Sequence, residues 1–282
     1  MQPSPAAPSP TSPIATAPAI FPWWGRYALA EGQGGIWEVG PLRLTVERRA
    51  REWRVSSQSA EPSAEGTASR LTVRCPVPAG ELPEGGSTAR FATQATTHPL
   101  VVEPVLPDRP VVARPDRPFH LLGGDEVALF VTLPVWARVR VAGDRQLVEV
   151  PTHRLADTWF GASTRFGELC YATRTAARLE LANVPVRPHM AICRVRLTNL
   201  AAAPLLVERL SLPVHHLDLF WHRDRGLWTR GIEVERAADG RLASLHIGSG
   251  PPDAVFGAEP VSPARQPELR RTLVRALEAL LG

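Results

Sequence analysis

The sequence contains no lysine, so all 32 of its basic side chains are arginines. Mechanisms that need a lysine nucleophile, a Schiff base or a phosphate-loop lysine are therefore excluded. The arginines are interleaved with 28 acidic residues along the whole chain, and no basic block stands out. Arginine suits phosphate and carboxylate recognition, but nucleic-acid binding usually needs a clustered basic surface. We therefore predict no nucleic-acid partner.

Cysteine is scarce, and Cys75, Cys170 and Cys193 lie too far apart in sequence to form a Cys-x-x-Cys pair. An odd count leaves at least one thiol free, which argues against a disulfide framework and suits a reducing compartment. No apolar run reaches the ~18 residues of a membrane span. The first residues also lack the charged start and apolar core of a secretory signal. The sequence therefore predicts a cytoplasmic protein without a membrane span.

Established enzyme motifs are missing too. The sequence has no Gly-x-Ser-x-Gly elbow, no phosphate-binding glycine loop followed by lysine, and no dinucleotide fingerprint in a βαβ frame. These absences leave room for an unfamiliar enzyme. A metal-dependent or cysteine-based enzyme of unknown substrate and cofactor therefore remains the alternative to a non-catalytic protein.

The chain divides into four parts by composition. Residues 1–23 are rich in Pro, Ala, Ser and Thr and bury too little apolar surface to fold, so we predict a disordered head. Alternating apolar and polar residues, broken by Gly and Pro turns, then predict a mainly β fold of antiparallel sandwich-like halves in tandem. We place an N-terminal β domain at 24–150, a second at 151–258, and a linker with a C-terminal amphipathic helix at 259–282.

Two segments carry specific structural expectations. Ile36–Val39, the turn Gly40-Pro41 and the alternation that follows to Val46 predict a hairpin. Prolines recur from Pro99 to Pro118, and proline has no amide hydrogen to give to a sheet. We therefore expect this segment to supply only short strands at sheet edges.

The C-terminal residues Pro267–Leu281 predict the one helix of the chain, because Pro267 suits a first helical position and leucines recur at helical spacing. The helix either packs its leucine stripe on the protein's own sheet or presents it to a partner, a second copy or a membrane surface. Mixed charges and a short length favour a protein among these partners. The candidate contact residues are Leu269, Leu273, Leu277 and Leu280.

An aromatic group follows the head, where Trp23 and Trp24 lie close to Phe21 and Tyr27. Such a group anchors a first strand on the core, or it forms an exposed contact for a partner. Trp23 and Trp24 are therefore the N-terminal candidates for an interaction site.

The stretch from Asp157 to Thr175 is the most distinctive of the sequence, with bulky aromatics beside Gly161 and Gly167. One interpretation makes Cys170 a nucleophile, with Glu168 on the same strand face and a distant histidine as base. The simpler interpretation is that Cys170 is a small buried side chain, since cysteine is among the most buried residue types.

Histidines gather between Pro213 and Gly226. If this segment is a strand, His216, Asp218 and His222 share one face, and imidazole with carboxylate can hold a metal ion. The alternative is a solvated strand face with surface histidines.

Several of these motifs together resemble an uncharacterised prokaryotic family, domain-of-unknown-function family 432. The resemblance lies in L-A-D-T-W-F-G and G-E-L-C-Y-A between Leu155 and Ala172, in Ile36–Val55, and in Leu217–Thr229. It covers about Trp24 to the C-terminus. It implies a soluble β-rich domain, no established activity or catalytic residues, and proteins that accompany small-conductance mechanosensitive channels.

Taken together, the missing catalytic motifs, the aromatic group and the amphipathic C-terminus predict a non-catalytic binding or adaptor module. We expect it to work through a protein partner or through self-association.

Overall fold

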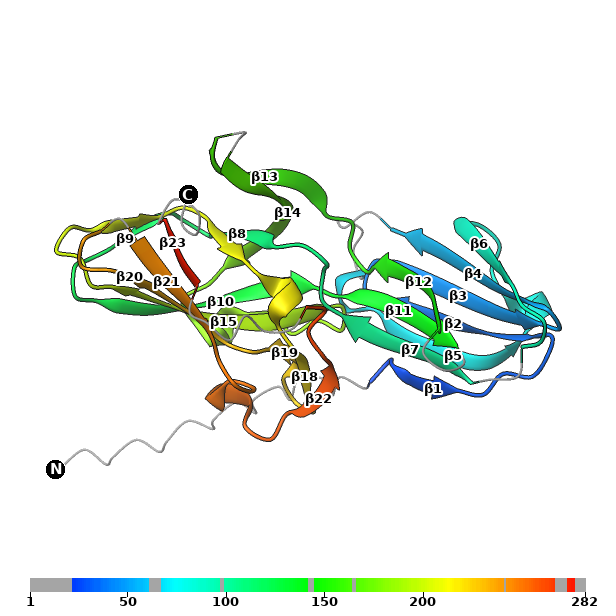
Figure 1. Ribbon diagram of the computed structural model, residues 1–282. Coiled ribbons are helices and arrows are strands. Elements are labelled where there is room, and N and C mark those ends of the chain that lie inside the picture. The colour runs from blue at the N-terminus through cyan, green and yellow to red at the C-terminus, as the bar shows by residue number, and fades with distance from the viewer. Residues whose placement is uncertain are drawn as a thin grey trace, which may run out of the picture.

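The computed structural model describes residues 22–60, 67–96, 99–141, 145–163, 166–240, 242–266 and 273–276. These residues form 23 strands and five single-turn 3-10 helices, arranged as two lobes side by side (Figure 1). The prediction of a mainly β, largely antiparallel fold is therefore confirmed. The 3-10 helices are η1 (Thr67–Ser69), η2 (Ala79–Glu81), η3 (Leu181–Asn183), η4 (Val214–His216) and η5 (Asp253–Val255).

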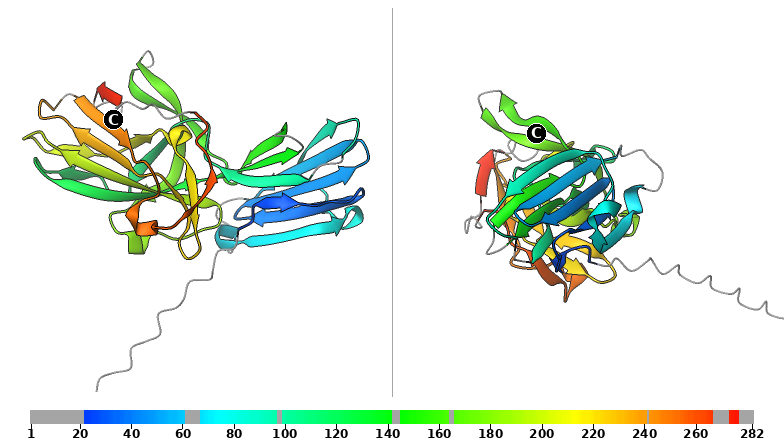
Figure 2. Two further views of the ribbon diagram at one scale, coloured as in Figure 1. Left: turned by 60° about the horizontal axis from the view of Figure 1, so that its bottom comes forward. Right: turned by 90° about the vertical axis from the view of Figure 1, so that its right-hand side faces the viewer.

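The N-terminal lobe contains two sheets that lie face to face (Figure 2). The five-stranded sheet has the order β5 (Leu71–Pro78), β2 (Gln33–Val39), β3 (Leu42–Arg49), β4 (Glu52–Ser59) and β6 (Ser87–Ala92). The four-stranded sheet has the order β1 (Gly25–Tyr27), β7 (Leu100–Val105), β11 (Trp136–Val141) and β12 (Arg145–Pro151).

The predicted first hairpin is confirmed as β2 and β3, which pair antiparallel around Gly40. Gly40 adopts a φ of +56°, a conformation that glycine reaches without steric cost. Alternate residues such as Trp37, Leu44 and Val46 are buried and belong to the same apolar cluster as residues of the facing sheet. The sequence alternation therefore marks the inward face of this sheet.

The C-terminal lobe is built around β15 (Met190–Asn199), whose residues Met190–Thr198 pair with the whole of β10 (Glu126–Pro134). On its other side β15 runs parallel to β19 and β20. The order of this eight-stranded sheet is β22 (Glu259–Ser262), β18 (Leu219–His222), β19 (Gly226–Thr229), β15, β20 (Ile232–Arg236), β21 (Leu242–Ile247) and β23 (Leu273–Ala276), with β10 joined to β15.

Two smaller sheets complete the second lobe. One has the order β13 (Ala156–Ser163), β14 (Phe166–Ala177), β8 (Val111–Pro115) and β17 (Leu210–Leu212), and the other pairs β16 (Leu205–Val207) with β9 (Phe119–Leu121). Part of β13 and β14 extends away from both lobes as a hairpin (Figure 1).

Strand pairing crosses the predicted division at residue 150. β8, β9 and β10 precede this position but pair with β14, β16 and β15, whereas β11 and β12 pair within the N-terminal lobe. The chain therefore enters the second lobe, returns to the first and leaves it again. The domain limits remain a prediction, but the two lobes are interleaved in sequence.

The predicted C-terminal helix is wrong where the structure describes it. Leu273–Ala276 form β23, which pairs antiparallel with β21 at the end of the large sheet. Without β23, the backbone groups along the outer edge of β21 would be unpaired. The hydrogen bonds that Leu273–Ala276 form with this edge offset the helical preference of their local sequence. Leu269, Leu277 and Leu280 lie outside the described residues.

The proline-rich segment also differs from expectation. β7 lies between β1 and β11, and β8 lies between β14 and β17, so neither strand is an edge. β8 contacts β14 in two short parts separated by a register shift, which leaves gaps in the hydrogen-bonding ladder. Short, interrupted pairing of this kind accommodates prolines, which have no backbone N–H group to donate to a neighbouring strand.

Candidate functional site

Cys170 lies in β14 with its side chain fully buried, in a small cluster with Val112 and Phe160. Its Sγ faces the backbone oxygen of Glu168 at 3.6 Å. The Glu168 carboxylate instead accepts a hydrogen bond of 3.2 Å from the Ser211 hydroxyl. The two residues share a strand face as predicted, but the burial of Cys170 fits its interpretation as a packing residue.

Burial holds the thiols of Cys75 and Cys193 in their protonated form. Burial raises the pKa of Cys75 to about 11 and the pKa of Cys193 to about 12. Because the thiolate is the nucleophilic form, neither group is activated for covalent chemistry near neutral pH.

The histidine segment does not form the predicted continuous strand. His215 and His216 lie in η4 with ring centroids 4.1 Å apart, whereas His222 ends β18. Asp218 forms an ion pair of 2.5 Å with Arg230 and accepts a hydrogen bond of 2.8 Å from the amide of Ala264. The Asp218 carboxylate is thus already occupied by partners within the chain.

His222 is engaged locally, since its Nδ1 accepts a hydrogen bond of 3.2 Å from the amide of Asp224. Across the described part of the chain, no three His, Cys, Asp or Glu side chains gather in a way that could hold a metal ion. The structure therefore does not bring His216, Asp218 and His222 together as a site. Metal binding by these residues stays a prediction without a structural cluster behind it.

The aromatic group at the start of the chain is packed at the junction of the lobes. Trp23 is fully buried and its Nε1 donates a hydrogen bond of 2.9 Å to the carbonyl of Pro188. Trp24 meets Trp23 and Trp221 edge-on, at centroid distances of 5.7 and 6.1 Å. Of the two earlier interpretations, these contacts favour anchoring of the first strand over presentation to a partner.

A different apolar surface is exposed on the projecting hairpin. We call this part the arm and define it as β13 together with Phe166–Cys170 of β14. Trp159 and Leu169 are directly opposite each other in the antiparallel register, and each side chain is 44% exposed. Large apolar side chains placed side by side on a surface are typical of interaction sites.

The glycines of the arm explain its shape. Gly161 adopts a φ of +152° at a register shift between β13 and β14, so the strand bends at this residue. A Cβ atom on Gly167 would lie 2.6 Å from both the Phe160 oxygen and the Trp159 Nε1. Gly167 thus lets the indole of Trp159 lie close against the neighbouring strand.

The base of the arm is braced by polar contacts to the body of the lobe. Arg109 forms an ion pair with Asp157 at 3.2 Å, and the Tyr171 hydroxyl donates a 3.0 Å hydrogen bond to Asp108. The guanidinium of Arg209 lies over the Phe160 ring at 5.0 Å. The inner face of the arm is therefore fixed, while the Trp159–Leu169 pair faces outward.

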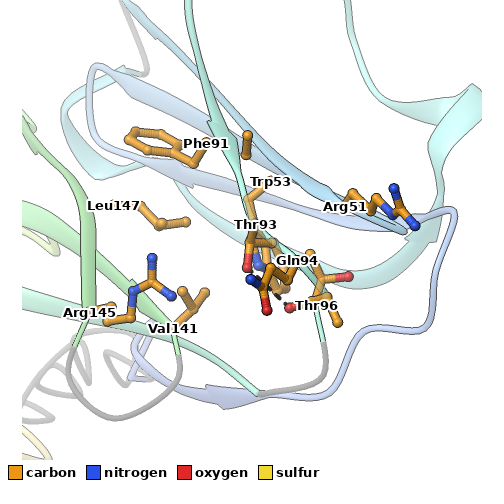
Figure 3. A pocket seen from close by; sticks show the side chains of 11 residues that line it. Arg51, Trp53, Phe91, Thr93, Gln94, Thr96, Val141, Arg145 and Leu147 are labelled. Carbon is orange, nitrogen blue, oxygen red and sulfur yellow. Dashed lines mark hydrogen bonds between the residues drawn. The ribbon is translucent and has the colours of Figure 1, made fainter.

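A cleft of about 990 Å³ opens at the side of the N-terminal lobe, between β4 and β6 of one sheet and β11 and β12 of the other. Figure 3 shows Phe91 and Leu147 on its apolar side and Thr93 and Gln94 opposite Arg145. Because β6 and β12 are the edge strands of their sheets, the cleft is the open flank of the sandwich.

A comparison with protein families matches residues 23–280 to the family described as "Protein of unknown function (DUF432)". This chain belongs to the DUF432 family. The match covers both lobes and confirms the resemblance that the sequence motifs indicate. No curated protein and no solved structure matches the chain.

In this member of the family, the sequence pattern points to the arm because of Cys170 and does not identify its exposed apolar pair. The stretch around Cys170 stood out, but its exposed surface is the cross-strand pair Trp159–Leu169. The cleft was missed entirely, because its lining comes from four separate strands and from the loop around Gln94. The cleft could be recognised only with the knowledge that β6 and β12 are the edge strands of two facing sheets.

Proposed function

We propose that this protein is a non-catalytic binding or adaptor module that works in the cytoplasm through a protein contact made by the arm. The observation that carries the proposal is the exposed Trp159–Leu169 pair on a hairpin whose base is braced by Arg109–Asp157 and Tyr171–Asp108. A fixed presentation lowers the conformational entropy lost on binding. The three free thiols agree with a reducing compartment.

The occupant that fits the arm is a different protein with an apolar pocket rather than a second copy of this chain. Aromatic side chains are each worth 150–250 Å² of buried area, so two arms meeting through their Trp159 and Leu169 side chains would bury roughly 400 Å². Stable interfaces bury at least about 1,200 Å². A convex arm gains more from a concave receptor, where an indole acts as a central anchor.

The proposal is tested by comparing baits in a pull-down from native extract, with soluble and membrane fractions kept apart. The arm variant carries Trp159→Ser and Leu169→Ser. The matched control carries Phe256→Ser and Leu206→Ser, which remove two other exposed apolar side chains, 90% and 43% exposed, from the same lobe. Circular dichroism and thermal melting establish that both variants are folded.

We expect a partner that the wild-type chain and the control retain in stoichiometric amount and that the arm variant loses. The extract fraction from which this partner is captured, soluble or membrane, distinguishes a soluble partner from a membrane-channel partner. The arm contact is wrong if the arm variant captures the partner as well as the control does. Sedimentation of the purified chain as a stable dimer that the arm variant abolishes would replace the hetero-partner by a second copy.

No helix in the described ranges is long and apolar enough to cross a membrane.

A further inference from the structure

The cleft on the N-terminal lobe carries an inference that is independent of the arm, which belongs to the other lobe. We propose that it binds a small amphipathic anion, with an apolar body and one carboxylate or phosphate group. Three features of the cleft support this proposal: its apolar wall, two arginines that form no ion pair among the described residues, and its position between two sheet edges.

The apolar part of the wall belongs to the core of the sandwich. Trp53 is 3% exposed and Val141 is 7% exposed, whereas Phe91 and Leu147 are half-buried and line the cleft with them. In a closed sandwich, side chains from both sheets fill this layer. An apolar ligand body that occupies the flank would remove these aromatic and aliphatic surfaces from water, which favours binding.

Arg145 supplies the charge. It is the first residue of β12, it is exposed, and its guanidinium points into the space beside Val141 and Leu147 in Figure 3. Arg51 marks the opposite end of the lining. Within the described residues, neither guanidinium forms an ion pair or a side-chain hydrogen bond.

Several other arginines of the same lobe, by contrast, form ion pairs with carboxylates. Arg138 and Arg140 pair with Glu103, and Arg54 and Arg90 pair with Glu52. A guanidinium beside an apolar wall offers planar donors that match a carboxylate or phosphate. The cleft therefore combines an unneutralised positive charge with an apolar floor.

The remaining lining suits a ligand with a polar end. The Gln94 side chain is exposed, and Figure 3 shows it with Thr93 on the side opposite Arg145. The volume of about 990 Å³ lies at the upper end of ligand pockets, which span roughly 300–1,000 Å³. The wall thus provides one charged position, adjacent amide and hydroxyl groups, and an apolar surface.

The test uses the intact chain and the fluorescent amphipathic anion 1-anilinonaphthalene-8-sulfonate as the probe. We expect saturable binding of one probe per chain and displacement by dodecanoate and by dodecyl phosphate. Dodecanol, which has the same apolar body without the charge, should displace the probe at least tenfold less well. The relative strength of dodecanoate and dodecyl phosphate then identifies the preferred headgroup.

Two variants locate the charge. Arg145→Gln should weaken the binding of both dodecyl anions about tenfold or more, because it removes a charge-assisted hydrogen bond. Arg26→Gln, which removes an exposed arginine from β1 of the same lobe, should leave the affinity unchanged. Leu147→Ser should weaken dodecanoate and dodecanol alike, since it alters only the apolar wall.

The proposal is overturned if the folded chain shows no saturable binding, or if dodecanol competes as well as dodecanoate. It is equally overturned if Arg145→Gln behaves as Arg26→Gln does. Melting temperatures measured on all variants exclude an effect of partial unfolding on the probe. None of these readouts depends on the arm, so failure here leaves the protein-contact proposal standing.

Discussion

At the scale of single residues, the burial of the three cysteines bears on the cysteine-enzyme interpretation. Cys170 and Cys193 are buried, and Cys75 is half-buried. Reactive cysteines of enzymes are partly exposed and have lowered pKa values, whereas burial here raises the pKa of Cys75 and Cys193. A cysteine-based enzyme would therefore require the buried thiol of Cys170 to become accessible to a substrate.

We therefore expect slow modification of the native protein by a thiol reagent such as 5,5′-dithiobis(2-nitrobenzoate) at pH 8. Three thiols should react at once only after unfolding in guanidinium chloride. Mass spectrometry of the partly modified protein identifies the first site, which should be Cys75. A single fast thiol that maps to Cys170 would instead revive the cysteine-enzyme alternative.

A second residue, His189, is buried at the junction between the lobes and is 2% exposed. Desolvation, with smaller effects of Arg187 and His153, lowers its pKa from 6.5 to about 3. Its backbone carbonyl accepts hydrogen bonds from the amide of Val135 and the hydroxyl of Thr152. The neutral imidazole is therefore part of the folded junction.

The sign of the pH effect follows from this pKa. The unfolded chain takes up the proton near pH 6.5, but the folded chain resists protonation down to about pH 3. The stability contribution is thus fully present above pH 6.5 and is lost as the pH falls toward 3. Between pH 7 and 5 this loss amounts to about 2 kcal/mol.

Urea unfolding at pH 7 and pH 5 checks the prediction. The decrease in free energy of unfolding should be about 2 kcal/mol smaller for His189→Gln than for the wild-type chain, because glutamine does not titrate. Carboxylates contribute equally to both proteins and cancel in the comparison. Identical pH dependence of the two proteins would show that His189 is not the group involved.

At the scale of elements, the segment after β22 connects the two lobes through Arg265. Its guanidinium pairs with Glu149 of β12 at 2.6 Å, donates to the Leu106 carbonyl at 2.5 Å and lies 5.5 Å from the Trp136 ring centroid. The Arg265 side chain is 15% exposed, so solvent screens these interactions weakly.

Arg265→Ala should lower the free energy of unfolding by roughly 2–3 kcal/mol. Breaking a buried pair costs about 3–5 kcal/mol, and Glu149 keeps its second partner, Arg138. The matched control is Arg49→Ala, which removes a pair with Glu47 whose arginine is 46% exposed. Exposed pairs are worth about 0–1 kcal/mol. Equal losses in the two variants, measured by denaturant unfolding, would contradict the connecting role of Arg265.

The elements also show how far sequence patterns reach. Alternation in the sequence predicted the hairpin of β2 and β3, because inward apolar residues such as Leu44 and Val46 alternate with polar ones along β3. The same rule failed for β6, whose sequence S-T-A-R-F-A has a single large apolar side chain. An edge strand that buries little leaves little pattern to detect.

Two other failures have the opposite cause, since a local pattern existed and tertiary contacts overrode it. The leucine spacing near the C-terminus is helical, yet Leu273–Ala276 add to β21 as a strand. Around His216 the chain turns through η4, and Asp218 is drawn to Arg230 and to the amide of Ala264. Neither the sheet edge nor these distant partners can be read from the local sequence.

At the scale of the whole molecule, the lobes share one continuous buried cluster that includes Trp37 and Val139 of the first lobe and Leu129 and Val195 of the second. Gly40 and His189 meet at their junction. A Cβ atom on Gly40 would lie 2.2 Å from the His189 Nδ1, a distance that the packed junction cannot accept.

Gly40→Ala should therefore destabilise the protein by roughly 3 kcal/mol. About 1 kcal/mol comes from the positive φ, and about 2 kcal/mol comes from overpacking. Gly32→Ala is the control, because Gly32 also has a positive φ, +77°, but no atom lies within 4 Å of its added Cβ. Gly32→Ala should lose only the roughly 1 kcal/mol of stability that comes from the positive φ. Similar losses in thermal unfolding would show that the contact between the lobes is loose.

Site-specific photo-crosslinking in living cells tests directly whether the arm contacts a protein partner. Leu169 on the arm and Leu206 on β16, which have nearly equal exposure of 44% and 43%, are replaced one at a time by p-benzoylphenylalanine. We expect one discrete crosslinked partner from position 169 and none from position 206. The same crosslinks from both positions, or none from position 169, would contradict it.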